Sequence, residues 1–368
     1  MRRRDFNLAL LRASASAILA PHLFARAMAQ DSSVPALYSN AIIIDSLCAP
    51  GVNPESPSPE SLAAVRQSGI TAVNFSISVP DSEETLYNLA NVQKLVDDSP
   101  DVFYIVRRHS DLALCKREHK LGIMMGFQYP QVLEAEPERI STYRKLGVRI
   151  MQLTYNNRSS FGDGCMEAAN QGLSNQGKLA IETMNEIGVA LDLSHSGYRT
   201  TSEGISQSSK PVLVTHAGCA AVYAHPRNKP DEILKSLADR GGYFGVYLMP
   251  YLVASPTVPT REHVLNHLLH AINVCGADHV GIGSDGVIPK MMFPSGSAAT
   301  DPNVAQRQEA GIGAPGEDRF PYVPDLNGPD HMQIIAAELV KRGQPASVIE
   351  KVLGANFQRV IGEIWGSS

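Results

Sequence analysis

Short, continuous apolar runs recur along the chain and predict eight β-strands. The runs span residues 41–45, 71–78, 122–127, 148–154, 189–194, 211–216, 242–248 and 279–284. They are rich in branched side chains and do not alternate with polar residues. That pattern is typical of strands covered on both faces, as in parallel sheets.

Segments with one apolar face and with helix-ending glycines separate these runs. They span residues 59–68, 81–97, 137–146, 174–187, 231–240 and 261–275, followed by 329–342 and 347–365 with Gly354 as a break. Strands that alternate with helices predict a parallel α/β fold. We expect a (β/α)8 TIM barrel over residues 30–368, a single domain with extra C-terminal helices. An open doubly wound sheet is the alternative.

Two Pro- and Ser-rich stretches lack an apolar pattern and are expected to be loops at the C-terminal rim of the barrel, where active sites are built. They cover residues 54–59 and 286–327. The glycines of 281–286 fall in and just after a strand, and no helix follows them. We therefore do not interpret that run as a phosphate-binding loop.

The N-terminal residues 1–29 have the features of an export signal. Arg3 and Arg4 precede Asp5 and Phe6, a mildly apolar stretch follows, and Ala27-Met28-Ala29 offers a cleavage site. We expect a twin-arginine signal and a periplasmic or secreted protein; an amphipathic first helix is the alternative. No apolar tail follows Trp365, so a membrane anchor is not expected.

Composition narrows the class of protein. Of the 368 residues, 43% are hydrophobic and 19% charged, enough apolar material for a large core. The net charge of −5 gives no basic footprint for nucleic acid. The five cysteines are far apart without a Cys-x-x-Cys pair, so neither a disulfide framework nor a structural zinc cluster is expected.

Polar residues end several predicted strands and would meet at one rim of a barrel. They are Asp45, Gln128, Tyr155, His195, His216 and Asp285. Two histidines and a carboxylate fit a catalytic zinc site or non-haem iron. The alternative for each histidine is a hydrogen-bonded core residue.

Arg227 and the histidines of one predicted helix are two further candidate sites. Arg227, in a loop after the sixth strand, is placed to bind a carboxylate through its forked donors, or else is a solvated loop residue. His263, His267 and His270 share one helix, but no His-Glu-x-x-His motif is present and the helix belongs to the outer ring.

Longer stretches carry a resemblance to a known family. They are LGVRIMQLTYNNRSSFGDGC, GLSNQGKLAIETMNEIGVALDLSHSG, PVLVTHAGCAAVYAHPRNKPDEILKSLADRGG, HVGIGSD and VLGANFQRVIGEIW. In order and spacing the chain resembles the membrane (renal) dipeptidase family of zinc metallopeptidases. The resemblance implies an eight-stranded barrel that cleaves dipeptides with two metal ions bridged by a glutamate.

The resemblance assigns roles to four residues. His195 and His216 match the two histidines that hold the second metal. Asp285 matches the acid that helps to activate the bridging water, and Arg227 matches the arginine that binds the substrate carboxylate.

The other half of the site departs from the family pattern. Leu47 and Ala49 stand where the family has a histidine and an aspartate that hold the first metal, Gln128 replaces the bridging glutamate, and Tyr155 replaces a substrate-facing histidine. At an effective dielectric near 20, two divalent ions about 4 Å apart repel by about 16 kcal/mol, which a neutral Gln128 cannot offset. We expect the first metal to be absent. Cys48 is not at a position that the family uses.

These observations leave two hypotheses. In the first, the chain is an exported metal-dependent dipeptidase-like hydrolase that cleaves a dipeptide or small amide with at most one divalent ion, zinc being expected. His195, His216 and Asp285 bind the ion, Asp285 also acts as base, Arg227 binds the substrate, and Tyr155 both contacts the substrate and donates to the oxyanion. In the second, a non-hydrolytic or repurposed barrel binds or modifies a peptide-like molecule in the periplasm. A homodimer is left open.

Overall fold

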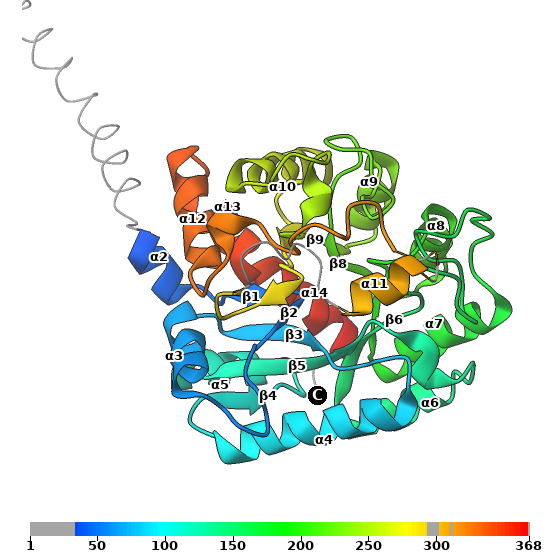
Figure 1. Ribbon diagram of the computed structural model, residues 1–368, viewed down its shortest axis with the longest axis horizontal. Helices are drawn as coiled ribbons and strands as arrows, with labels where there is room; N and C mark the ends of the chain where they lie inside the picture. The colour runs from blue at the N-terminus through cyan, green and yellow to red at the C-terminus, as the bar shows by residue number, and fades with distance from the viewer. Residues whose placement is uncertain (1–33, 293–301, 310, 312, 367–368) are drawn as a thin grey trace, which may run out of the picture.

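Eight parallel strands follow one another in a single path around a barrel, as the sequence predicts (Figure 1). The computed structural model describes residues 34–292, 302–309, 311 and 313–366. The strands are β1 (Ile44–Asp45), β3 (Ala72–Ser76), β5 (Leu121–Phe127), β6 (Val148–Gln152), β7 (Ala190–Asp192), β8 (Leu213–Ala217), β9 (Tyr243–Val246) and β10 (Val280–Ile282). Each matches a predicted run, although β5 begins and β8 ends one residue outside its run. The match confirms the (β/α)8 barrel and excludes an open doubly wound sheet.

The barrel closes between its first and last strands through a few bonds just beyond the strand ends. The backbone nitrogen of Ser46 donates to the carbonyl oxygen of Ile282 at 2.9 Å. Beyond this bond, the short parallel strands β2 (Cys48–Ala49) and β11 (Gly286–Val287) pair with each other. The residues that follow β1 and β10 are therefore held together at the C-terminal rim.

One further strand of the barrel sheet was not predicted, and neither were the short strands β2 and β11. Strand β4 (Phe103–Ile105) pairs with the first residues of β5, and β6 pairs with the last ones. A run of three residues is too short to be distinguished from a loop by its pattern.

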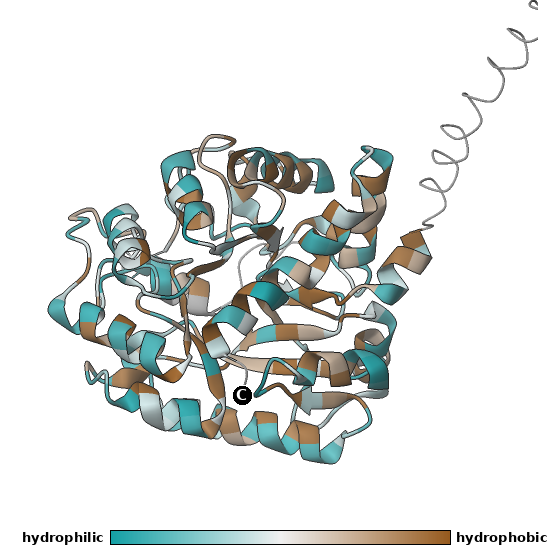
Figure 2. Ribbon diagram, turned by 180° about the vertical axis from the view of Figure 1, so that it is seen from behind, coloured by the Kyte–Doolittle hydropathy of each residue, from teal (hydrophilic) through white to brown (hydrophobic). Residues whose placement is uncertain are grey.

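Helices cover the outside of the barrel. They are α2 (Val34–Asn40), α3 (Pro59–Ser68), α4 (Ser82–Asp98), α5 (Asp111–Glu118), α6 (Arg139–Leu146), α7 (Asn175–Ile187), α8 (Tyr198–Gln207), α9 (Asp231–Asp239), α10 (Arg261–Cys275), α11 (Pro302–Glu309), α12 (His331–Lys341), α13 (Ala346–Glu350) and α14 (Asn356–Trp365). Short helical turns are η1 (Pro130–Leu133), η2 (Pro250–Leu252), η3 (Pro324–Leu326) and η4 (Lys351–Ala355). Figure 2 shows hydrophobic residues on the central strands and mixed hydrophilic and hydrophobic residues along the surrounding helices.

Helix α14 packs across the end of the barrel opposite to the site. Its side chains Phe357, Val360, Ile361, Ile364 and Trp365 share one buried cluster with strand residues such as Ile44, Met124, Leu213 and Tyr243. The predicted break lies at Gly354, where a β-carbon would come 2.3 Å from the carbonyl oxygen of Ile42. Only glycine allows the chain to pass so close to the first strand and then continue as α14.

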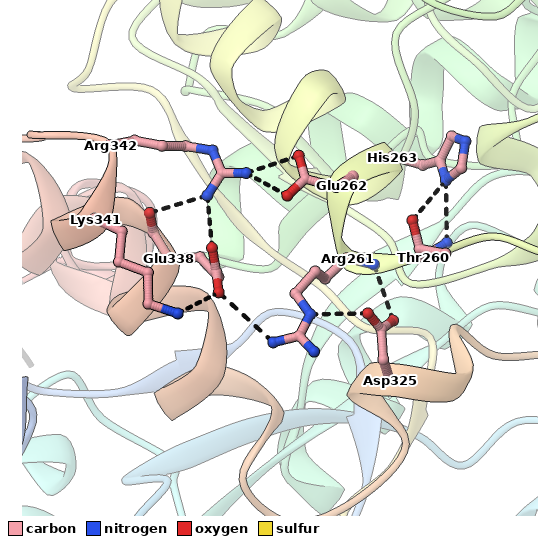
Figure 3. A network of polar contacts seen from close by, with 8 residues as sticks. All are labelled: Thr260, Arg261, Glu262, His263, Asp325, Glu338, Lys341 and Arg342. Atoms are coloured by element: carbon pink, nitrogen blue, oxygen red, sulfur yellow. Dashed lines mark hydrogen bonds and ion pairs between the residues drawn. The ribbon is translucent and has the colours of Figure 1, made fainter.

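An ion pair between Arg261 and Asp325 fastens the long stretch after β10 to α10, and further ion pairs join α10 to the C-terminal end of α12 (Figure 3). Asp325 of η3 accepts from the backbone nitrogen and from Nε of Arg261 at the start of α10. Arg342 binds Glu262 of α10 through two oxygens and also pairs with Glu338 of α12. These bonds hold the returning chain beside the C-terminal rim.

The predicted export signal, residues 1–29, lies outside the described residues. Within the described part of the chain, none of the helices combines the length and apolar character needed to span a bilayer.

Candidate active site

Three of the predicted strand-end residues meet directly at the C-terminal rim of the barrel. Gln128 follows β5, His195 follows β7, and His216 lies in β8. The two imidazole rings are 5.0 Å apart between centroids. The side-chain nitrogen of Gln128 lies 3.4 Å from Nε2 of His195 and 3.2 Å from Nε2 of His216. Both histidines thus present the same ring nitrogen to one place.

The ring of His195 is oriented by Asn156, in the loop after β6. Nδ1 of His195 lies 2.8 Å from the side-chain oxygen of Asn156, so this nitrogen carries the proton and donates it. Nε2 is then an unprotonated acceptor. This is the arrangement by which a partner on one ring nitrogen prepares the other as a ligand.

His216 is oriented by a longer chain of hydrogen bonds inside the barrel. Its Nδ1 lies 2.8 Å from Oγ1 of Thr215, and that hydroxyl donates to Asp192 at 2.6 Å. Asp192 is buried and accepts further bonds from Ser194 and from Gln152. The hydroxyl of Thr215 therefore accepts the proton of Nδ1, and Nε2 of His216 is left as an acceptor.

The Gln128 amide complements the two imidazoles in their neutral form. An amide nitrogen has two N–H donors, one for each unprotonated Nε2. Burial, assisted by the charge of Arg227, lowers the pKa of both His195 and His216 well below the ordinary value. Both rings are therefore neutral at physiological pH, and Nε2 of each ring carries no proton.

Tyr155 stacks on His195 and extends the site toward the mouth of the barrel. The two rings are 4.1 Å apart, and Tyr129 stacks on the other face of Tyr155 at 4.3 Å. Burial raises the pKa of Tyr155 well above its ordinary value, so its hydroxyl stays protonated and can donate. Arg307 of α11, paired with Glu317 at 2.6 Å, contributes positive charge to this stack.

Arg227 is a buried residue behind the histidines rather than a solvated loop residue. It is 2% exposed. Its Nη1 donates to the carbonyl oxygen of Ser194 at 2.5 Å, and Nη2 donates to that of His216 at 3.5 Å. These two bonds use part of the five N–H donors of the guanidinium group.

Asp285 lies at the closing seam of the barrel and borders the same cavity as Gln128. The cavity, of about 100 Å³, is also lined by Leu47 and Ala49. Burial raises the pKa of Asp285 to about 7, although Arg227 partly offsets the effect. Its backbone adopts φ of 57°, and its nitrogen donates to the carbonyl oxygen of Leu47 at 2.8 Å. Aspartate tolerates this left-handed conformation better than most residues.

The predicted ligands His195, His216 and Asp285 are thus at one rim, but they are not preassembled as a three-ligand cluster. Among the described residues, no group of three or more His, Cys, Asp or Glu side chains is placed to hold a metal ion. The role of this trio as metal ligands stays a prediction.

Asp45, the acid at the end of β1, serves the scaffold. One carboxylate oxygen accepts from the backbone nitrogens of Leu47 and Ser284, which joins the two sides of the seam. The other oxygen is 3.1 Å from Nε2 of His331 at the start of α12. Both side chains are buried.

The three histidines of α10 are structural. His267 is buried and bonds to the carbonyl oxygen of Leu252, His270 pairs with Asp231, and His263 caps the helix with Thr260. The five cysteines are all free. Within the described part of the chain, neither the α10 histidines nor the cysteines belong to a group of three or more possible metal ligands.

Sequence reasoning did not find several residues that build the site. Asn156, Thr215 and Asp192 orient the histidines, and Tyr129 and Arg307 flank Tyr155. Thr215 and Asp192 lie on predicted strands, next to His216 and close to His195, so their place in the sequence pointed to the site. Arg307 lies in a stretch with no pattern and could not have been found.

Proteins with similar sequences include dipeptidases. Dipeptidase verJ from Clonostachys rogersoniana is 28% identical over 287 residues, which cover 76% of this chain and 65% of that protein. Dipeptidase tcpJ from Claviceps purpurea is 26% identical over 285 residues, which cover 76% of this chain and 60% of that protein. The chain therefore spans less than two thirds of the length of these relatives.

Solved structures share the fold. An amidohydrolase from Pseudomonas aeruginosa is 30% identical and superposes with a TM-score of 0.78, covering 91% of this chain and all of that one. A metallopeptidase from Rhodobacter sphaeroides, solved with a phosphinate mimic of the dipeptide L-Ala-D-Ala, is 16% identical, with a TM-score of 0.73 and coverage of 89% and 100%. At that identity the second comparison shows the fold alone.

The family comparison extends over most of the chain. The model of the membrane dipeptidases, peptidase family M19, matches residues 31–294, from before the first strand to beyond Asp285. All the site residues described above except Arg307, Glu317 and His331 fall within this range. The chain belongs to the membrane dipeptidase family, peptidase family M19.

Proposed function

We propose that this chain is a dipeptidase-like hydrolase that cleaves a dipeptide or a small amide with one divalent metal ion, zinc. The observation that carries the proposal is the common direction of two unprotonated imidazole nitrogens, Nε2 of His195 and of His216, each fixed by a partner on its Nδ1. Neutral imidazoles held in this way are the commonest protein ligands of zinc.

The donor set fits one ion and does not fit two. A second ion would need a further pair of imidazoles or a carboxylate as ligands. Leu47 and Ala49 offer no ligand atom on their side of the cavity. The neutral Gln128 cannot bridge two cations. His195 and His216 would hold the single ion, with Asp285 as a third ligand or as a base beside it.

The residues of the site supply the rest of the chemistry. A bound divalent ion supplies Lewis acidity, which polarises a carbonyl group and makes water a stronger acid. Asp285, with a pKa of about 7, can accept a proton from water near neutral pH. Tyr155 remains protonated and can donate to a developing oxyanion. Arg227 binds the substrate carboxylate with its remaining donors.

The export of the chain also remains a proposal. Arg3 and Arg4 with the following apolar stretch support a twin-arginine signal and action in the periplasm or outside the cell. Lysine at both positions is expected to retain the protein in the cytoplasm, as measured by cell fractionation. Unchanged export of this variant would contradict the proposal.

A second candidate is favoured by one observation. The amide of Gln128 already provides a donor for both imidazole nitrogens, so the pair is satisfied without an ion. In this case the barrel binds or modifies a peptide-like molecule without hydrolysis. A barrel with satisfied histidines beside an arginine keeps the capacity to bind a carboxylate.

Metal analysis and a dipeptide hydrolysis assay on the same preparation separate the two candidates. We expect one equivalent of tightly bound metal, hydrolysis that is lost after treatment with EDTA, and loss of both in His195→Ala. His119→Asn, an exposed change in a left-handed backbone position, serves as the matched control. No metal and no turnover after addition of zinc, cobalt or manganese would exclude the hydrolase.

A further inference from the structure

A second, larger cavity lies beside the site. It has a volume of about 430 Å³ and is formed by the loop after β2, the end of β3 and one face of α4. Volumes of this size are typical of small-molecule sites. Val92 and Leu95 of α4, which are 4% and 2% exposed, contribute its apolar wall.

The two cavities share part of their lining. Ala49, Phe75 and Ser76 border both the large cavity and the small one that Gln128 and Asp285 line. A molecule at Gln128 that extends away from the histidines therefore meets the large cavity. The shared wall includes Ala49, one of the two positions where the family resemblance implies a metal ligand and this chain has an apolar residue.

The lining of the large cavity carries no charge. Its polar residues are Asn53, Ser76, Ser78, Asn88 and Asn91. Ser76 and Ser78 accept from the backbone nitrogens of Gln128 and Tyr129, Asn53 accepts from Glu55, Asn88 donates to Ile77, and Asn91 bonds to Tyr87. Each of these polar side chains thus makes at least one interaction within the protein. The rest of the lining is uncharged aliphatic and aromatic surface, which favours an apolar occupant.

We propose that this cavity receives an extended apolar group, an acyl chain or a long apolar side chain, on the amino side of the scissile amide. The assignment of the amino side rests on the proposed function. Arg227 bonds to the carbonyl oxygens of Ser194 and His216, so a carboxylate bound there lies on the histidine side of the site. The other end of the substrate then points past Gln128 toward Ala49 and the cavity.

The chain length of the ligand tests this proposal without turnover. We compare N-acetylglycine with N-octanoylglycine by titration calorimetry, on protein dialysed against EDTA so that no hydrolysis intervenes. Each methylene that is buried strengthens binding by about fourfold. The octanoyl probe is expected to bind more than about a hundredfold more tightly than the acetyl probe.

Two variants fill the cavity from two different segments of its lining. Asn91→Phe on α4 and Val79→Phe after β3 are each expected to abolish the gain from chain length while N-acetylglycine binds as before. Ala90→Phe, an exposed change beside Asn91, is the matched control and should keep the full gain. Circular dichroism checks that each variant is folded.

The proposal is overturned if the two probes bind with affinities within about threefold of each other, which would mean that a protein segment or a partner occupies the cavity. It is also overturned if both filled variants retain the gain. Failure of the proposed function has a different signature. Chain-length dependence without hydrolysis of any dipeptide by the metal-loaded protein would refute the hydrolase alone, whereas hydrolysis without chain-length dependence would refute the cavity assignment alone.

Discussion

The side-chain nitrogen of Gln128 lies 3.2 Å from Nε2 of His216 and 3.4 Å from Nε2 of His195. A neutral donor therefore stands where the resemblance to the dipeptidases implies an anionic bridge between two metal ions. This one difference weakens the attraction of the site for cations while it leaves the imidazoles correctly oriented.

Replacing this amide by a carboxylate is expected to strengthen metal binding. In Gln128→Glu an anion faces the two imidazole nitrogens, and we expect the affinity for zinc to rise about 10–100-fold. Equilibrium dialysis against a competing chelator measures the change, with the exposed Gln93→Glu as control. Unchanged affinity in Gln128→Glu would show that the two histidines do not bind the ion.

Restoring the other half of the site is expected to change stoichiometry rather than affinity alone. The triple variant Leu47→His, Ala49→Asp and Gln128→Glu supplies the ligand types that a second ion needs. We expect bound metal to rise from one equivalent toward two by elemental analysis. If the stoichiometry does not move, the assignment of these three positions is wrong.

The hydroxyl of Thr215 is expected to control the metal affinity of His216. Thr215→Val keeps the shape of the side chain but removes the acceptor of Nδ1, so the ring loses its fixed tautomer. Zinc affinity should fall about 10–100-fold. Thr215→Ser retains the hydroxyl and should bind zinc as the parent does; equal losses in both variants would point to packing instead.

Asp285 makes the metal-free protein less stable as pH rises. Its pKa is about 7 in the fold and near 4 in the unfolded chain, so the protonated form is favoured by folding. The stabilising contribution of that form is complete below pH 4 and is lost as pH rises through 7.

Asp285→Asn should therefore be more stable than the parent by about 1–3 kcal/mol at pH 8 and nearly equal to it at pH 4. Urea unfolding of EDTA-treated protein at the two pH values measures this, with the exposed Asp239→Asn as control. A difference that does not vary with pH would contradict the buried position of the carboxyl group.

The pair of Asp45 and His331 has its own pH dependence. Burial alone would lower the pKa of His331, but its bond to Asp45 and that negative charge raise the pKa above the ordinary value. The contribution to stability is therefore complete below about pH 6.5 and is lost as pH rises through the folded pKa. His331→Gln should cost about 1–3 kcal/mol at pH 6 and less at pH 9, measured by urea unfolding. An equal cost at both values would mean that the charge of His331 plays no part.

The fold could be predicted because its elements carry local signals. All eight barrel strands are continuous apolar runs, and Gly354 indicated the break before α14. Helix α8 was missed because its sequence, YRTTSEGISQ, is rich in residues with weak helix preference. Its Thr200, Thr201 and Gly204 are buried, so the helix is stabilised by packing, which no local pattern reveals.

Only those site residues that lie at strand ends or within family motifs could be predicted from the sequence. His195, His216 and Gln128 were brought together correctly because the carboxyl ends of parallel strands share one rim. The burial of Arg227 and the bond between Asp45 and His331 depend on contacts between segments far apart in the chain. Such contacts are set by tertiary packing and not by the residues next to them.

Helix α14 seals the far end of the barrel with a row of apolar side chains that fit against the strands. During translation this segment leaves the ribosome after all eight strands. Until then, the end of the barrel that α14 covers stays exposed. The barrel can therefore be completed only after all eight strands have been made, and until α14 docks its exposed apolar end is a place where the unfinished chain can aggregate.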